Sequence, residues 1–129
     1  MNNMKTKRYF ILSSISFGVI CIVISIFLLY KKLYNMDNLP VGDYLKSLDS
    51  PNHNYTLNAY RYSGGATMDL TLRVEVVNNK DGNCRNIYWN YHESEANMKW
   101  LSNEIVKINN KKLNIKMDKY DYRYDFSKD

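Results

Sequence analysis

The sequence predicts a mainly β protein: one N-terminal transmembrane helix, then a small antiparallel β meander folded as a sandwich or a half-open barrel. Two observations lead to this prediction. The stretch Tyr9–Tyr30 contains no charged residue, which is typical of a membrane-spanning helix. After it, short runs of alternating apolar and polar residues are separated by turn residues every few positions, which is typical of antiparallel strands.

The apolar stretch, YFILSSISFGVICIVISIFLLY, is long enough to cross a lipid bilayer. As a helix it is about 33 Å long, because each residue adds about 1.5 Å, and a hydrocarbon core is about 30 Å thick. Tyr9, Phe10 and Tyr30 stand at its ends, where aromatic rings prefer the membrane interface. The lipid bilayer is therefore the expected partner of residues 9–30.

This span is expected to be a retained anchor. A cleaved signal peptide has an apolar region of only about 7–15 residues and a small-x-small cleavage site, and no such site follows Tyr30. A lipoprotein signal would need a small residue before Cys21, where Ile20 stands. The span contains no ionisable residue of the kind that transporters and proton relays use. Its small residues form no clean small-xxx-small face, so it gives little support for a helix dimer. The oligomeric state stays open.

Charge gives an orientation and excludes one class of partner. Of the 18 Lys and Arg residues, Lys5, Lys7 and Arg8 precede the span, and this concentration favours a basic cytoplasmic tail over residues 1–8. We therefore expect a single-pass protein of the cell membrane with an extracytoplasmic C-terminal domain. The later basic residues are scattered singly along the predicted strands, so no nucleic-acid partner is expected.

The chain after the span divides into three predicted parts. Residues 31–50 form a juxtamembrane stalk, with Pro40 and Gly42 ending the helix and one short helical turn from Gly42 to Leu48. Residues 51–118 form the β domain. Residues 119–129 form a polar, Tyr-rich tail that either pairs as a last edge strand or stays loose.

The clearest strand runs over residues 67–78. Its two faces alternate: one carries Met68, Leu70, Leu72, Val74 and Val76, and the other carries Thr67, Asp69, Thr71, Arg73 and Glu75. We expect the first face in the core and the second in water. In the next strand, residues 86–92, the side chains of Ile87, Trp89 and Tyr91 are expected on one face.

No motif predicts chemistry. The densest ionisable cluster is His92-Glu93-Ser94-Glu95, but zinc takes three or four ligands and the only other histidine is His53. There is no G-x-S-x-G motif, and Gly64-Gly65 is interpreted as a turn. We therefore expect no catalytic residue, metal ligand or cofactor, and no enzyme. Cys84 is expected to be unpaired, because the only other cysteine lies in the span.

Aromatic residues offer a candidate interaction surface. The chain has 12 tyrosines, some of which must fill the core because large aliphatic residues are few in the domain. The candidate surface consists of Tyr60, Tyr62, Tyr88, His92 and Glu93.

Three stretches, SPNHNYTLNAYRYSGGAT, RVEVVNNKDG and NIYWNYHESEANMKW, resemble a domain-of-unknown-function family of small Gram-positive bacterial proteins with an N-terminal membrane span. The resemblance covers about residues 40–123. It implies a bacterial, membrane-anchored protein and supplies no activity or functional residues.

These observations lead to one function hypothesis and two alternatives. The first is a single-pass membrane protein that presents a β domain for binding an envelope protein or a cell-wall component. The alternatives are an envelope hydrolase with an unrecognised site and an accessory or immunity-type subunit of a membrane complex.

Overall fold

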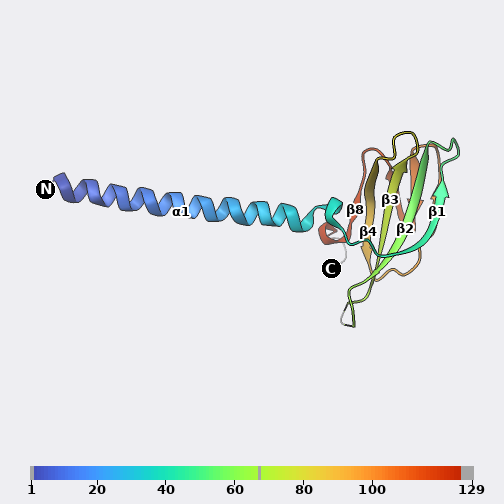
Figure 1. Ribbon diagram of the computed structural model, residues 1–129, viewed down its shortest axis with the longest axis horizontal. Coiled ribbons are helices and arrows are strands. Elements are labelled where there is room, and N and C mark those ends of the chain that lie inside the picture. Colours follow the sequence, from blue (N-terminus) through green and yellow to red (C-terminus); the bar gives the residue numbers. More distant parts are fainter. Residues whose placement is uncertain (1, 67, 126–129) are drawn as a thin grey trace. The chain divides into compact units, whose positions relative to one another are not determined.

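The chain consists of an N-terminal helical unit, Met1–Asn38, and a β domain, Leu39–Asp129. The structure, a computed structural model, describes residues 2–66 and 68–125 (Figure 1).

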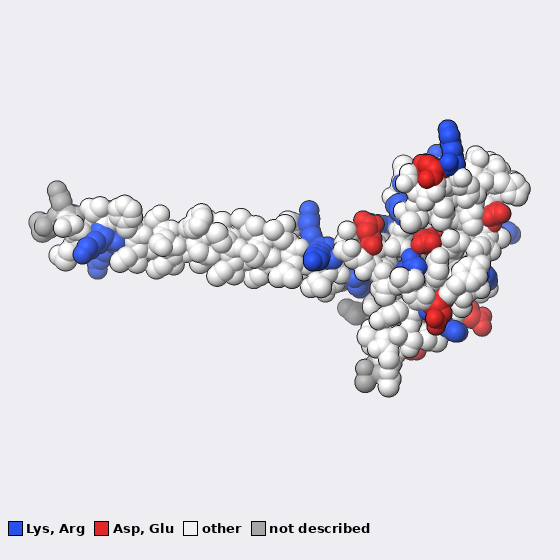
Figure 2. All heavy atoms as spheres, viewed as in Figure 1, with Lys and Arg blue, Asp and Glu red and all other residues white. Residues whose placement is uncertain are grey.

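The helical unit is one long helix, α1 (Asn2–Tyr34), followed by a short 3-10 turn, η1 (Met36–Asn38). The helix includes the whole predicted span and continues past both of its ends. Ser25 Oγ donates a hydrogen bond to the Cys21 carbonyl at 2.8 Å, so that this hydroxyl is satisfied inside the helix. Figure 2 shows Lys and Arg side chains at both ends of the helix and a long uncharged surface between them.

The β domain contains a five-stranded sheet with the order β1-β2-β3-β4-β8, visible side by side in Figure 1. Its strands are β1 (Asp43–Asp49), β2 (Tyr55–Ser63), β3 (Leu70–Asn78), β4 (Cys84–Tyr91) and β8 (Tyr120–Asp121). Neighbouring strands are antiparallel except for β4 and β8, which are parallel. A short 3-10 turn, η2 (Tyr122–Tyr124), follows β8.

A second, three-stranded antiparallel sheet has the order β5-β6-β7. Its strands are β5 (Met98–Trp100), β6 (Ile105–Ile108) and β7 (Lys111–Asn114). One core joins the two sheets, with Leu57, Leu72 and Val74 from the first and Val106 and Ile108 from the second, all fully buried. The predicted fold class is therefore confirmed: an N-terminal helix precedes two small, mostly antiparallel sheets, and the described strands close no barrel.

Strand β3 shows where alternation predicts burial and where it does not. Leu72, Val74 and Val76 face the core as expected, but Thr71 and Arg73, expected in water, are only 1% and 6% exposed. That expectation is wrong because Arg73 packs on the Tyr60 ring and bonds to neighbours on this second face. Met68, expected in the core, precedes the strand and is exposed.

Strand β4 departs from simple alternation because of a bulge. The pairing of β3 with β4 shifts between Val74 and Glu75, and this adds one residue to β4. Both Ile87 and Tyr88 consequently lie in the core, whereas Trp89 is opposite Arg73 on the other face. The expected common face for Ile87 and Trp89 is therefore wrong.

The segment from Gly42 to Leu48 forms no helical turn, because residues from Asp43 onward are strand β1. A register shift between Tyr44 and Lys46 lets Leu45 and Leu48, three residues apart, both be half-buried. In the Tyr-rich tail, Tyr120 and Asp121 pair with β4. Of the two alternatives predicted for the tail, these two residues follow the edge strand. Residues 126–129 of that tail and Thr67 of the predicted β3 strand lie outside the described residues.

Candidate functional site

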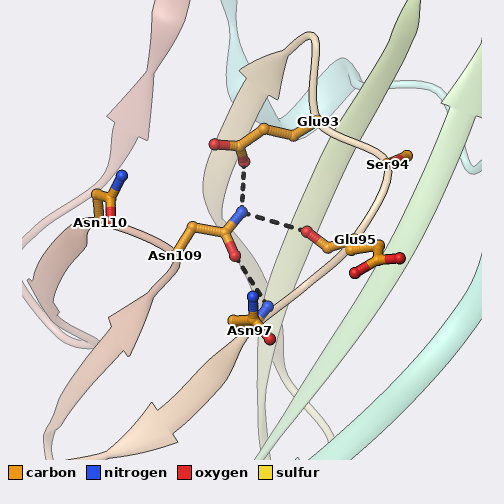
Figure 3. A pocket seen from close by; sticks show the side chains of 6 residues that line it. All are labelled: Glu93, Ser94, Glu95, Asn97, Asn109 and Asn110. Atoms are coloured by element: carbon orange, nitrogen blue, oxygen red, sulfur yellow. Dashed lines mark hydrogen bonds between the residues drawn. The ribbon is translucent and has the colours of Figure 1, made fainter.

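An open, shallow pocket of about 410 Å³ lies where the link from β4 to β5 meets the turn between β6 and β7 (Figure 3). It is lined by Glu93, Ser94, Glu95, Asn97, Asn109 and Asn110. All six residues are polar, so the pocket offers hydrogen bonds and negative charge.

Asn109 organises the pocket. Its side-chain Nδ2 donates to Glu93 Oε2 at 2.7 Å and to the Glu95 carbonyl at 3.2 Å. Its Oδ1 accepts from the Asn97 backbone N–H at 2.8 Å, and Figure 3 shows these bonds. Asn109 has φ +47°, a left-handed conformation that asparagine tolerates well, and so it closes the turn while holding the preceding link in place.

Glu93 connects the pocket to the core through Tyr88. The Tyr88 hydroxyl donates to Glu93 Oε2 at 2.7 Å and accepts from Asn90 Nδ2 at 3.2 Å. Burial, followed by the bond to Glu93, raises the pKa of Tyr88 above its ordinary value. The hydroxyl therefore stays protonated at neutral pH and acts as a hydrogen-bond donor that fixes the carboxylate.

His92 lies apart from this network. It has φ +60°, and its Nδ1 pairs with Asp69 Oδ2 at the surface. That bond lowers the pKa of the Asp69 carboxyl. The pair joins the end of β4 to the residue before β3, and its exposure favours a local structural role.

A second polar cluster lies on the face of the five-stranded sheet that is opposite the core. The Arg73 guanidinium donates to Glu75 at 3.0 Å and to Asn86 at 2.8 Å, and lies 4.1 Å from the Tyr60 ring centroid. The Tyr60 hydroxyl donates to Glu75 at 3.0 Å. Burial and this bond raise the pKa of Tyr60, so the cluster pairs one cation with one carboxylate beneath an aromatic ring.

The structure does not bring the five candidate residues together on one surface. Tyr88 is 1% exposed and packs in the core, so its ring is not available at the surface. Tyr60 belongs to the opposite face of the sheet, as does Tyr62, whose ring centroid is 6.3 Å from that of Trp89. Glu93 is the candidate residue that lines the pocket, while His92 pairs with Asp69.

The groups of this pocket offer hydrogen bonds and negative charge. Among the described residues, no group of three or more His, Cys, Asp or Glu side chains could hold a metal ion. Ser94 has no hydrogen bond to a histidine within residues 2–66 and 68–125, and Cys84 is an exposed free thiol. The pocket therefore offers carboxylate, amide and hydroxyl groups to a polar ligand.

The family model of DUF5412, a family of unknown function, matches residues 6–125. The chain belongs to this family. The DUF5412 match includes most of α1 and both sheets, a wider range than the resemblance in the strand motifs. No curated protein and no solved structure matches the chain.

Two elements of these sites were missed by reasoning from sequence. The side chains of Arg73 and Glu75 were expected to be solvent-exposed. An Arg and a Glu two residues apart on one strand lie on the same face and can form an ion pair. Asn109 is absent from the candidate residues of the sequence analysis. The three asparagines at 97, 109 and 110 were a signal, because asparagine side chains often complete turns.

Proposed function

We propose that this member of DUF5412 is a single-pass protein of a bacterial cell membrane, anchored by α1, that presents its β domain outside the cytoplasm as a binding module. One observation carries the proposal: α1 is a long apolar helix whose most apolar window is entirely unburied in the described structure. The candidate span Asn3–Tyr34 has a mean hydropathy of 2.6 over its most apolar window, of which none is buried.

Exposed apolar side chains on this scale need a nonaqueous environment. Phe17, Ile22 and Phe27, for example, are 70%, 60% and 56% exposed. Burying one such side chain is favourable by about 1.5–3 kcal/mol, so a bilayer stabilises the helix strongly. Every backbone N–H and C=O inside such a helix is also satisfied, as the hydrocarbon region requires.

The orientation follows from the flanking charges. Lys5, Lys7 and Arg8 precede the apolar stretch and Lys31 and Lys32 follow it. The larger group favours the cytoplasmic side, which puts the β domain at the outer surface. There the domain offers a polar pocket to an envelope protein or a cell-wall component.

Alkaline carbonate extraction of isolated membranes tests the anchor. The full-length chain is expected in the membrane pellet at the size of the uncleaved protein, 15.3 kDa, and only detergent should release it. A variant with Val19→Asp and Val23→Asp should lose the pellet fraction, because each carboxylate at the centre of a span costs about 2.5–3.5 kcal/mol.

The matched control replaces two residues of the β domain, Asn79→Asp and Asn110→Asp, and should stay in the pellet. Release of the unchanged protein by carbonate, or a shortened chain in the pellet fraction, would contradict the retained anchor.

A further inference from the structure

Three lysines stand in a row across the second sheet. The strand pairing puts Lys99 of β5 directly opposite Lys107 of β6, and Lys107 directly opposite Lys112 of β7. All three are exposed, while Val106 and Ile108 on either side of Lys107 are fully buried in the core. The row, which we call the lysine ladder, therefore occupies the outer face of the sheet.

The ladder is electrostatically unfavourable by itself. Side chains directly opposite each other on antiparallel strands have Cβ atoms about 4.5–5.5 Å apart, and like charges there destabilise the sheet. Within residues 2–66 and 68–125, none of the three lysines forms an ion pair, whereas Lys111 and Lys116 pair with Asp125 and Glu104. An external anion would supply the missing negative charge.

The ladder leads into a hollow. Lys99 and Lys107 also line an open pocket of about 280 Å³, which Lys46 of β1 joins from the other sheet. The side-chain amide of Asn97 lines the same pocket and can donate hydrogen bonds to phosphate oxygens. Three lysines thus form a row by strand register, and Lys46 of a fourth strand lines the hollow together with two of them.

We propose that the lysine ladder and this hollow bind a linear polymer of phosphodiester groups at the cell envelope, without reading any base or sugar. The charge of the ladder fits repeated phosphates, and its single row fits a chain. The ligand's envelope location rests on the proposed function, but the binding itself does not.

A linear polymer fits this site better than a planar membrane surface does. A flat layer of headgroups cannot enter the hollow, and the carboxylates of Glu93 and Glu95 in the adjoining pocket would repel a broad anionic plane. Single-stranded nucleic acid is also a linear polyphosphate, but it binds strongly where aromatic rings stack on its bases. The ladder positions contain no aromatic residue.

The test is a titration of the full chain, held in phosphatidylcholine nanodiscs, with a glycerol phosphate oligomer at low and raised salt. The unchanged protein should bind with an affinity that falls steeply as salt rises. Lys99→Gln with Lys107→Gln should weaken binding by at least about fivefold and flatten the salt dependence, because two phosphate contacts are lost. The matched control, Lys80→Gln with Lys119→Gln, removes the same charge from other exposed positions and should bind like the unchanged protein.

Melting temperature provides a second measurement that does not depend on high affinity. Lys107→Gln should raise the melting temperature of the free protein, because it removes both like-charge contacts. The oligomer should raise that temperature more for the unchanged protein than for this variant.

Four results would overturn the proposal: no binding at low salt, equal weakening by both double variants, binding to anionic vesicles in place of the oligomer, or preference for oligothymidine of equal charge. A β domain found in the cytoplasm would refute the proposed function and leave this titration unaffected.

Discussion

The Arg73 and Glu75 side chains form an ion pair that is almost removed from water. Their side chains are only 8% and 15% exposed, and Arg73 Nη2 also donates to the Val41 carbonyl at 2.9 Å. Burying two charges is costly, and hydrogen bonds to the buried groups offset part of that cost. Both terminal nitrogens of Arg73 have partners, whereas its Nε has none among the described residues. The pair therefore fixes one conformation of this sheet face and of the chain segment at Val41.

Glu75→Gln should destabilise the β domain by about 3 kcal/mol, because it leaves the Arg73 charge buried without a counterion. Chemical unfolding followed by tryptophan fluorescence measures the change. Glu104→Gln is the matched control: it breaks the exposed pair with Lys116 and should change stability little. If the two substitutions lower the unfolding free energy equally, burial of the Arg73–Glu75 pair makes no difference to stability.

Three tyrosine hydroxyls donate to carboxylates, and this predicts how stability depends on alkaline pH. Burial first, and then bonds to Glu75, Glu93 and Asp125, raise the pKa of Tyr60, Tyr88 and Tyr120 respectively. In the unfolded chain these hydroxyls ionise near pH 10. The stabilisation is therefore complete below about pH 10 and declines as pH rises through the folded-state pKa values, since the unfolded state then binds fewer protons.

Two measurements check this. Tyrosinate absorbance should show a group of tyrosines that titrates late in the folded protein, and urea midpoints should fall above about pH 10. Tyr88→Phe should reduce that decline. If all tyrosines titrate together near pH 10 and the urea midpoint does not fall, the predicted pH dependence is wrong.

At the scale of elements, strand β1 depends on a tight approach of the backbone at Gly42. Gly42 has φ +72°, and a Cβ atom there would lie 2.8 Å from the Arg61 carbonyl oxygen. Gly82, in the turn between β3 and β4, has nearly the same φ of +73° with nothing within 4 Å of an added Cβ. The two glycines thus share a conformation and differ in the space around them.

Gly42→Ala should therefore destabilise the domain more than Gly82→Ala. The turn variant should cost about 1 kcal/mol for the left-handed backbone, and the β1 variant about 1–3 kcal/mol more because backbone atoms must shift. The difference between the two unfolding free energies isolates the steric contact. Equal costs would mean that β1 moves aside freely at this position.

Most strands follow from alternation, but two elements could not be predicted. Leu45 and Leu48 are three residues apart, a helical spacing, and only the bulge in β1 explains why both are half-buried in a strand. The bulge in β4 moves Ile87 and Tyr88 to the same side. A bulge depends on the partner strand, which a pattern within one strand does not include.

At the scale of the whole molecule, the division into an apolar helix and a β domain was predictable, because uncharged length and alternation are properties of the chain itself. The candidate site was less predictable. Glu93 was identified as a candidate residue, but its neighbour Asn109 comes from a turn 16 residues away. The row of Lys99, Lys107 and Lys112 appears scattered in sequence and becomes a row only through strand register.

Labelling of Cys84 in intact cells tests the central claim, an anchored protein with an external β domain, most directly. Cys84 is exposed in the β domain, whereas Cys21 lies within the apolar span and is replaced by serine in the test protein. A membrane-impermeant maleimide should label Cys84 in intact cells as completely as in lysed cells, and Cys84→Ser should abolish labelling. Labelling that appears only after lysis would contradict the account, because it would place the β domain in the cytoplasm.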